Sequence, residues 1–370
     1  MSDNPTVIQE SNPYDNVLKI QIQNSPVCVV NAIRRTILAD IPCYVFNGFP
    51  VSENNITIHK NTCRLNNEII KQRISCIPVH LTDFTLPYES IEFTINVSNT
   101  TNSMLLVTTD DFQVNAVQSN MDDETTTVTP DIVEQFNPKV LFPHDPITKS
   151  PIVITRLKPK INEKLPGEVL HLTAKLSISS AKHNGCYNVS STCSFSNTVD
   201  ETNATIAWDN LASTMNFESP EDESAFRENW MLLEGKRHFK PNQFNFILEA
   251  IGIYDNKTLL QIACKVLVEK LNIVQQLDDI SIKDSHSTIE NAKDILMKSD
   301  YSIGKMLEHY IHENFQKDIT YVSFFKAHPH DEDSILRIAL KSDAETSIET
   351  IVTNTSNTIV ETLDKLSKAF

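Results

Sequence analysis

Residues 17–40, VLKIQIQNSPVCVVNAIRRTILAD, contain the two patterns that decide the fold. The first seven residues alternate between apolar and polar side chains, which is typical of a strand with one buried face. Ser25 and Pro26 follow, and this pair predicts a helix start with serine as the N-cap and proline in the first turn. Apolar residues then recur at helical spacing, at Val30, Ile33 and Ile37. The stretch therefore predicts a strand followed at once by an amphipathic helix that ends near Asp40.

The same order of elements occurs twice along the chain: a strand, a helix, further strands and a long closing helix. The first copy is formed by residues 17–40 and 243–275, with a large insertion between them, and the second copy is residues 287–370. The closing helix of the second copy carries one apolar seam, at Ile348, Val352, Thr355, Ile359, Leu363, Leu366 and Phe370. Neither copy can cover its own sheet and helices, so we expect the two copies to pack helix to helix. The alternative is that such an order recurs by chance in a mixed protein.

Local patterns predict the remaining elements. Strand patterns occur at 45–58, 91–97, 104–108, 112–118, 152–157, 169–178, 243–254, 288–297, 319–326 and 334–341. Helical patterns occur at 66–75, 257–275, 300–315 and 345–368. Residues 183–240 carry no clear pattern; Pro220–Glu223 is predicted as a surface turn, Asp122–Glu124 as an exposed loop and 278–287 as a polar linker. The chain from about residue 80 to residue 185 is thus predicted to form a separate β-rich module.

Composition excludes several classes of protein. Lys and Arg number 32 against 48 Asp and Glu, and the net charge of −16 argues against holding nucleic acid through the overall field. The six glycines form no glycine-rich phosphate loop. The N-terminal residues lack an apolar signal core and no apolar run reaches the length of a membrane span, so we expect no membrane contact. Seven scattered cysteines, an odd number, indicate a reducing compartment rather than a disulfide framework.

No metal, cofactor or catalytic motif is evident. His183, Cys186 and Cys193 have the spacing H-x2-C-x6-C, but a structural zinc site usually shows two short ligand pairs. The acidic clusters lie in predicted loops without a structural frame, and no local nucleophile motif supports a hydrolase. We therefore predict no bound metal, no cofactor and no active site in this chain.

Several stretches resemble the α-like assembly subunits of cellular RNA polymerases. Asn31–Leu38, followed by Asp40–Pro42, looks like the first helix of that family, and Asn61–Glu68 with Gln72–Pro78 looks like its next motifs, N-x-S-x-L-x-D-E and R-L-x-x-I-P. Phe244–Leu271 is similar to the closing strand and helix. In the second copy, Ser299–Leu307 is similar to the E-D-H-T-L-G-N-L-L signature of the small partner subunit, and Lys326–His330 loosely matches its Y-x-x-P-H-P region.

The chain thus resembles subunit 3 fused to subunit 11 of RNA polymerase II, in the family of bacterial α and archaeal D and L. The resemblance implies an α+β fold of two dimerisation units, each an antiparallel sheet with packed helices, the first interrupted by a β-rich insert. The predicted domains are 1–52 with 180–278, then 53–179, and 279–370. Fused pairs occur in some large DNA viruses, and the Asn- and Ile-rich composition fits such a source. We accordingly expect a virion and host-cytoplasm location, or the nucleus for a cellular protein, and no secretion.

The resemblance implies a non-catalytic assembly platform of DNA-directed RNA polymerase that docks the two large subunits, with other polymerase subunits as further partners and no specific DNA contact. The catalytic signature N-A-D-F-D-G-D of the polymerase is absent. One alternative is an acidic transcription regulator that binds DNA through a basic patch at Lys158–Lys160 or Lys236–His238. It predicts salt-sensitive DNA binding by the isolated chain.

Two sets of residues are predicted to act in assembly. The resemblance implies that the large-subunit interface lies at Asn31, Arg34, Arg35, Glu68 and Arg73. Arginine suits this role because its planar fork binds carboxylates bidentately, although two adjacent arginines also suit a solvated helix face.

Pairing of the two copies is predicted at Val30, Ile33, Ile37, Ile303, Gly304, Leu307, Tyr310, Ile359 and Leu363, where the alternative is ordinary core. A glycine inside a helix costs about 1 kcal/mol against alanine, and we expect a close helix crossing to offset this cost at Gly304. The linker between the copies, from about residue 276 to 287, has roughly 12 residues and reaches at most ~40 Å, so pairing within one chain is feasible and a swapped homodimer is the alternative.

Overall fold

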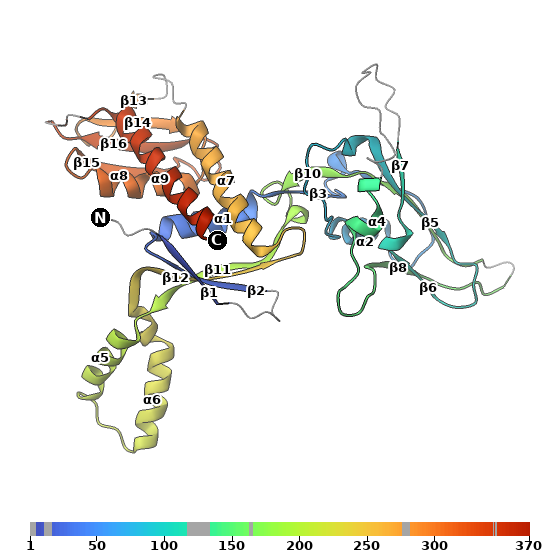
Figure 1. Ribbon diagram of the computed structural model, residues 1–370, viewed down its shortest axis with the longest axis horizontal. Coiled ribbons are helices and arrows are strands. Elements are labelled where there is room, and N and C mark those ends of the chain that lie inside the picture. Colours follow the sequence, from blue (N-terminus) through green and yellow to red (C-terminus); the bar gives the residue numbers. More distant parts are fainter. Residues whose placement is uncertain are drawn as a thin grey trace. The chain divides into compact units, whose positions relative to one another are not determined.

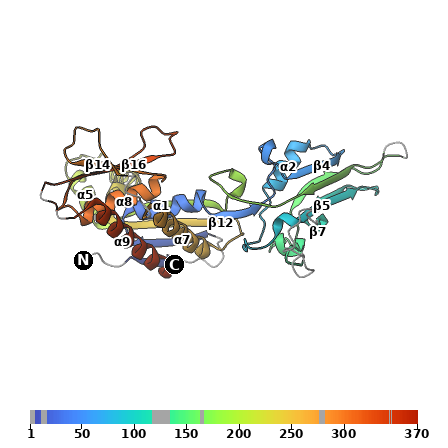
Figure 2. The same cartoon turned by 90° about the horizontal axis from the view of Figure 1, so that it is seen from above.

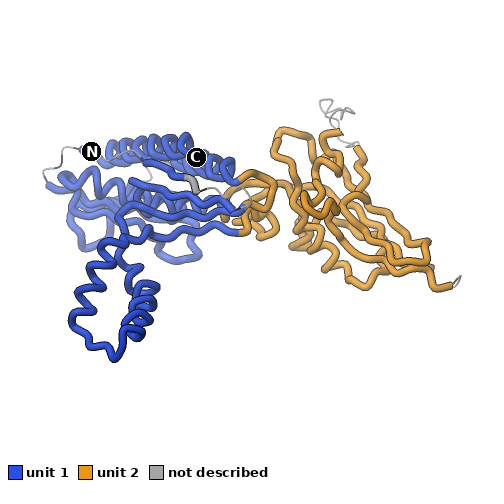
Figure 3. Tube along the Cα trace, turned by 60° about the horizontal axis from the view of Figure 1, so that its bottom comes forward, with its two compact units in different colours: residues 1–37, 192–249, 256–370 blue, residues 38–191, 250–255 orange. Residues whose placement is uncertain are grey.

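The computed structural model describes residues 5–10, 17–116, 134–162, 166–275, 282–342, 344 and 346–370. The chain divides into two compact units, which are described separately (Figure 3). Unit 1 comprises residues 1–37, 192–249 and 256–370, and unit 2 comprises residues 38–191 and 250–255. Most of the first copy and the whole of the second belong to unit 1. The domain boundaries drawn from the sequence stay a prediction.

The first copy in unit 1 is a four-stranded sheet with two helices (Figure 1). Its strand order is β1 (Thr6–Glu10), β2 (Val17–Gln23), β12 (Phe239–Ala250) and β11 (Ser190–Val199). Helix α1 (Val27–Ala39) follows β2, and α7 (Asn256–Gln275) follows β12. The alternation predicted for β2 is confirmed, because Ile20 and Ile22 are buried and lie opposite Phe246 and Phe244 of β12 in an antiparallel register.

The second copy repeats this arrangement. Its strand order is β13 (Ile282–Asp284), β14 (Ala292–Met297), β16 (Ser334–Leu340) and β15 (Ile319–Phe325). Helix α8 (Tyr301–Asn314) follows β14, and α9 (Ile348–Ala369) follows β16. In both sheets the order along the sheet is first, second, fourth and third strand of the copy, and a helix follows the second and the fourth strand. The predicted α+β fold with two such units is confirmed.

The long helices of the two copies pack against each other. Figures 1 and 2 show α7 beside α9, and α8 also contacts α9. The seam predicted for α9 is buried at Ile348, Val352, Thr355, Ile359, Leu363 and Leu366, whereas Phe370, just beyond the helix, is half-buried. Burial of a continuous apolar stripe is the main source of stability for a surface helix. The packing of α9 on α7 therefore buries apolar helix surface that neither copy could bury alone.

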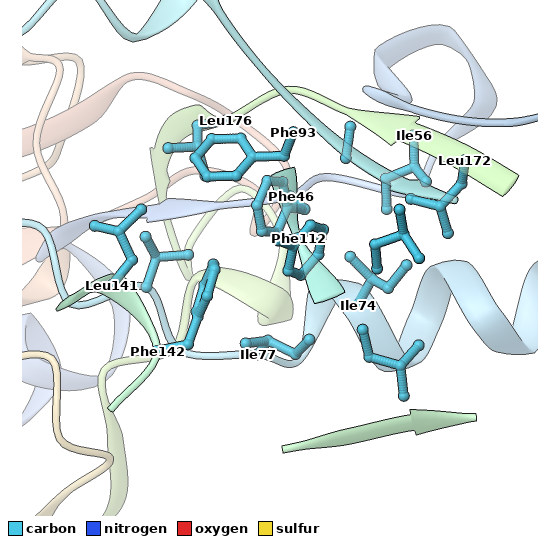
Figure 4. Close-up of a cluster of buried hydrophobic side chains, with 14 of the residues drawn as sticks. Phe46, Ile56, Ile74, Ile77, Phe93, Phe112, Leu141, Phe142, Leu172 and Leu176 are labelled. Atoms are coloured by element: carbon cyan, nitrogen blue, oxygen red, sulfur yellow. The ribbon is translucent and has the colours of Figure 1, made fainter. Parts of the chain in front are cut away.

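Unit 2 is the β-rich insertion. It contains the sheet β4 (Ile56–Asn61), β9 (Val169–Ala174), β5 (Ile91–Ser98) and β7 (Gln113–Ala116), and the strand pairs β3 (Pro42–Val45) with β10 (Ser177–Ser180) and β6 (Leu105–Thr108) with β8 (Val153–Leu157). Among the described residues of unit 2, helices are formed by α2 (Asn67–Ser75) and α4 (Pro138–Leu141). Figure 4 shows its core, where the ring of Phe46 contacts Phe93 edge-on and stacks on Phe112.

Three local predictions are wrong. Residues 45–58 are not one strand, because the chain runs from β3 through Gly48 and Pro50 before β4 begins at Ile56. Pro220–Glu223 is no surface turn: it is the first turn of α6 (Pro220–Leu232), which pairs with α5 (Glu201–Ala212) in a helical hairpin. The predicted linker 278–287 contains β13.

Some predictions fall outside the described residues. These are the loop Asp122–Glu124, the N-terminal residues 1–4 and 11–16, and residues 276–281 of the linker. None of the helices that the structure describes is long and apolar enough to cross a membrane.

Candidate subunit interface

Helix α1 turns its predicted apolar stripe toward the interior of unit 1. Val30 and Ile33 are completely buried, and Ile37 is nearly so. The carbonyl oxygen of Pro26 accepts the first helical hydrogen bonds from the backbone N–H groups of residues 29 and 30. The predicted serine cap is wrong, because the buried hydroxyl of Ser25 has no hydrogen-bond partner in the described structure.

All residues predicted to pair the two copies are buried in unit 1. They are Val30, Ile33, Ile37, Ile303, Gly304, Leu307, Tyr310, Ile359 and Leu363. Burial suits ordinary core as well as pairing, so their part in dimerisation stays a prediction.

Gly304 allows a close contact, but not the one expected. A Cβ atom at this position would fall into the ring of Phe324, a residue of β15 in the same copy. The glycine therefore lets α8 approach its own sheet, and the prediction of a helix crossing at Gly304 is wrong. The ring takes the place that a side chain on the helix would fill.

Helices α1 and α8 meet through polar groups. The Nε atom of Arg35 donates a hydrogen bond of 3.0 Å to Oγ of Ser302, at the start of α8. Further along, a hollow of about 440 Å³ lies between the two helices, lined by Val27, Cys28, Asn31, Lys305, Glu308, His309, His312 and Val322. Burial raises the pKa of the Cys28 thiol to about 12, so the thiol stays protonated at neutral pH.

An ion pair joins the first copy to the second. Nζ of Lys270, in α7, lies 3.1 Å from Oδ2 of Asp300. Asp300 is the N-cap of α8, and its other oxygen accepts hydrogen bonds from the backbone N–H groups of Ser302 and Ile303. Burial alone would raise the pKa of Asp300, but Lys270 and the two N–H groups hold it below its usual value.

The predicted large-subunit residues of α1 lie on the outer part of that helix. Arg35 is exposed, whereas Arg34 and Asn31 are half-buried. Nε of Arg34 donates to Oδ1 of Asn31 at 3.0 Å. Within the described ranges no carboxylate forms an ion pair with either arginine, so both positive charges are held only by neutral groups.

The other two predicted residues lie in unit 2. Helix α2 is capped by Asn66, whose Oδ1 accepts a hydrogen bond from the N–H group of Ile69. Glu68 and Arg73 are exposed on this helix. A terminal nitrogen of Arg73 donates to the carbonyl oxygen of Val153 at 2.7 Å, which ties α2 to β8. Arg73 thus has a structural contact that the sequence did not predict.

His183, Cys186 and Cys193, which have the spacing H-x2-C-x6-C, do not form a metal-binding group in the described structure. Nε2 of His183 lies 2.7 Å from Oε2 of Glu53. The described part of the chain contains no group of three or more His, Cys, Asp or Glu side chains that could hold a metal ion.

Sequence reasoning missed Lys270, Asp300 and Ser302 as contacts between the copies. Asp300 stands just before a helical pattern, which is a recognisable capping signal. Nothing local in the sequence identifies Lys270 as the partner of Asp300, or Arg35 as the partner of Ser302. These contacts join segments that are far apart along the chain.

The fold consists of two α-like units with the same strand order, whose long helices pack against each other. Comparison with known families matches residues 19–271 to the RNA polymerase Rpb3/Rpb11 dimerisation domain. The match covers more than half of the chain, and the chain belongs to this family. A search among curated proteins gave no match. Membership supports a role in the assembly of RNA polymerase subunits.

Proposed function

We propose that this chain is a non-catalytic assembly subunit that acts as a single-chain counterpart of the subunit 3–subunit 11 pair and docks the two large subunits of a DNA-directed RNA polymerase. The observation that carries the proposal is the repeated topology: two sheets with the same strand order and two matching helix pairs, packed together within unit 1. A pair normally made by two subunits is thus available within one polypeptide. A viral source remains part of the proposal.

The outer part of α1 is the proposed contact for a large subunit. Arg34 and Arg35 carry the positive charges there, in a chain with a net charge of −16. Because only neutral groups hold these guanidinium groups in the described structure, carboxylates of a partner can pair with them without breaking an internal ion pair. The hollow between α1 and α8 lies along the same helices and offers an apolar wall for a partner side chain.

A charge reversal tests this proposal. The double variant Arg34→Glu/Arg35→Glu is co-expressed with the two large subunits of its polymerase, and the recovered complex is measured by affinity purification. We expect recovery to fall at least about tenfold, because two attractive contacts become repulsive. The matched control is Lys139→Glu/Arg156→Glu, which changes the charge equally at two exposed positions of unit 2.

Unchanged circular dichroism and tryptophan emission establish that both variants are folded. Recovery of a normal complex by the folded α1 variant would overturn the docking proposal. Equal losses for the variant and the control would show a general effect of charge and would overturn the assigned surface as well.

A further inference from the structure

The helical hairpin α5–α6 is an addition that the repeated fold does not need. It occupies residues 200–238, between the adjacent strands β11 and β12, and projects from the sheet of the first copy (Figures 1 and 3). The equivalent strands of the second copy, β15 and β16, are joined by residues 326–333 alone. Long connections in compact proteins usually carry a function, so the hairpin calls for a role of its own.

The hairpin has its own small core. Trp208 of α5 is buried, and its ring lies 5.8–6.3 Å from the rings of Trp230, Phe226 and Phe217. Asp200 caps α5, and Ser219 caps α6 with Pro220 in its first turn. The hairpin is therefore held in one shape by its own residues and can present a fixed surface.

The face of α5 opposite Trp208 is left uncovered. Residues two apart in a helix point in nearly opposite directions, so Ile206 points away from the aromatic core and is 54% exposed. Together with Phe239, which is 48% exposed, it forms the apolar part of a hollow of about 420 Å³. The hollow is lined by Asn203, Ile206, Ala207, Asn210, Arg237, His238 and Phe239. Its size lies within the range of roughly 300–1,000 Å³ that binding pockets occupy.

The charges around this hollow differ from those of the chain as a whole. Arg237 is the one formally charged side chain among the described lining residues; it is highly exposed and lies 3.0 Å from Glu234, which does not line the hollow. Lys236 and Lys240 are exposed neighbours along the chain. At the other end of the hairpin, the first turn of α6 carries three exposed carboxylates, at Glu221, Asp222 and Glu223. At the base of the hairpin these basic residues are balanced by Asp200, Glu201 and Glu234, so the base is neutral overall whereas the tip is negative. Because the pair of Arg237 with Glu234 is largely exposed, it is weak and can be exchanged for a carboxylate of a partner.

We propose that this hollow is a docking site for a segment of a partner protein that carries a large apolar side chain next to a carboxylate. Ile206 and Phe239 would bury the apolar side chain, Arg237 would bind the carboxylate, and the amides of Asn203 and Asn210 would hydrogen-bond to the peptide groups of the segment. The acidic first turn of α6 disfavours nucleic acid, because it would repel phosphates. The surface is small, so the contact is of the weak, exchangeable kind.

A random twelve-residue peptide library displayed on phage tests the proposal against the full-length chain. It is panned in parallel on the wild type, on Ile206→Asp, on Arg237→Glu and on the control Ile147→Asp, whose isoleucine is 89% exposed in unit 2. Tryptophan emission shows whether the hairpin is folded in each variant, since both tryptophans of the chain lie in the hairpin. We expect the wild type and the control to enrich peptides that combine Asp or Glu with an aliphatic or aromatic residue.

A synthetic copy of an enriched peptide then gives the affinity by fluorescence anisotropy. We expect Ile206→Asp to weaken binding at least about tenfold and Arg237→Glu several-fold, with no change for the control. The proposal is overturned if no peptides distinguish the wild type from folded Ile206→Asp, if basic peptides are enriched, or if single-stranded RNA displaces the peptide. It is also overturned if light scattering shows a homodimer that Ile206→Asp abolishes, since a second copy would then be the occupant.

Discussion

The ion pair between Lys270 and Asp300 provides a direct test of how the two copies are joined. The perturbation is a double-mutant cycle of Lys270→Met and Asp300→Asn. Asparagine caps helices as well as aspartate does, so Asp300→Asn removes the charge and keeps the cap of α8. Any other interaction of Lys270 cancels in the cycle, and the coupling energy isolates the contact between α7 and α8.

The structure gives the expected magnitude. Both side chains are about one quarter exposed and their charged atoms are 3.1 Å apart. Fully exposed pairs contribute roughly 0.2–1 kcal/mol, and hydrogen bonds to charged groups about 1.5–3 kcal/mol. We therefore expect a coupling of about 1 kcal/mol near neutral pH. Asp300→Ala should lose about 1 kcal/mol more than Asp300→Asn, because it also removes the cap.

The pH dependence of this coupling has a definite sign. The pKa of Asp300 in the folded chain lies below its ordinary value of about 3.9. The ionised carboxylate thus contributes stability that is fully present above the unfolded pKa and is lost as the pH falls through the folded pKa. We expect the coupling to be constant between about pH 5 and pH 7 and to decrease below about pH 4.

Urea unfolding followed by far-ultraviolet circular dichroism measures the cycle, because α1, α7, α8 and α9 of unit 1 contribute most of the described helical residues. The midpoints are determined for the four proteins at pH 7, pH 4 and pH 3. A coupling below ~0.3 kcal/mol at pH 7 is within the usual error of additivity and would refute the reasoning. So would a coupling that stays constant as Asp300 is protonated.

Three further substitutions test the packing. Gly304→Ala should lower the free energy of unfolding by about 1–3 kcal/mol despite the higher helix propensity of alanine, because the new methyl group would overlap the ring of Phe324. Adding Phe324→Leu should restore part of the loss, and an unchanged urea midpoint for Gly304→Ala would contradict the overlap. Leu363→Ala should cost about 2.7–5 kcal/mol, whereas Glu361→Ala on the exposed side of α9 should stay within ~0.5 kcal/mol; similar midpoints would contradict a buried seam. Ser219→Ala should lower the urea midpoint of tryptophan emission by removing about 1 kcal/mol of capping, and an unchanged midpoint would show that the cap is unimportant.

Much of the fold followed from local patterns. The alternation at residues 17–23 and the seam of α9 each identify one buried face, so β2 and α9 could be predicted closely. The strand–helix order was equally visible in both copies. These features are encoded by neighbouring residues, and a single sequence displays them.

The hairpin α5–α6 escaped prediction for a physical reason. Trp208, Phe226 and Trp230 pack on one another rather than on the main core, so neither helix shows a clear apolar stripe. A signal was nonetheless present, since Ser219 and Pro220 followed by three acidic residues form a typical helix start. The same residues also favour a turn, because proline and serine are frequent in turns.

Contacts between distant segments could not be predicted at all. The place of Gly304 against Phe324 and the hydrogen bond of Arg35 to Ser302 depend on the tertiary arrangement. The sequence predicted which faces are apolar, but the partner of each face is decided by the packing of whole elements.

Native mass spectrometry of the complex with the two large subunits tests the central claim most directly. If one chain supplies both halves of the dimerisation unit, each complex should contain one copy of this 41.8 kDa chain. Two copies in each complex would contradict the account, because the halves would then pair between chains.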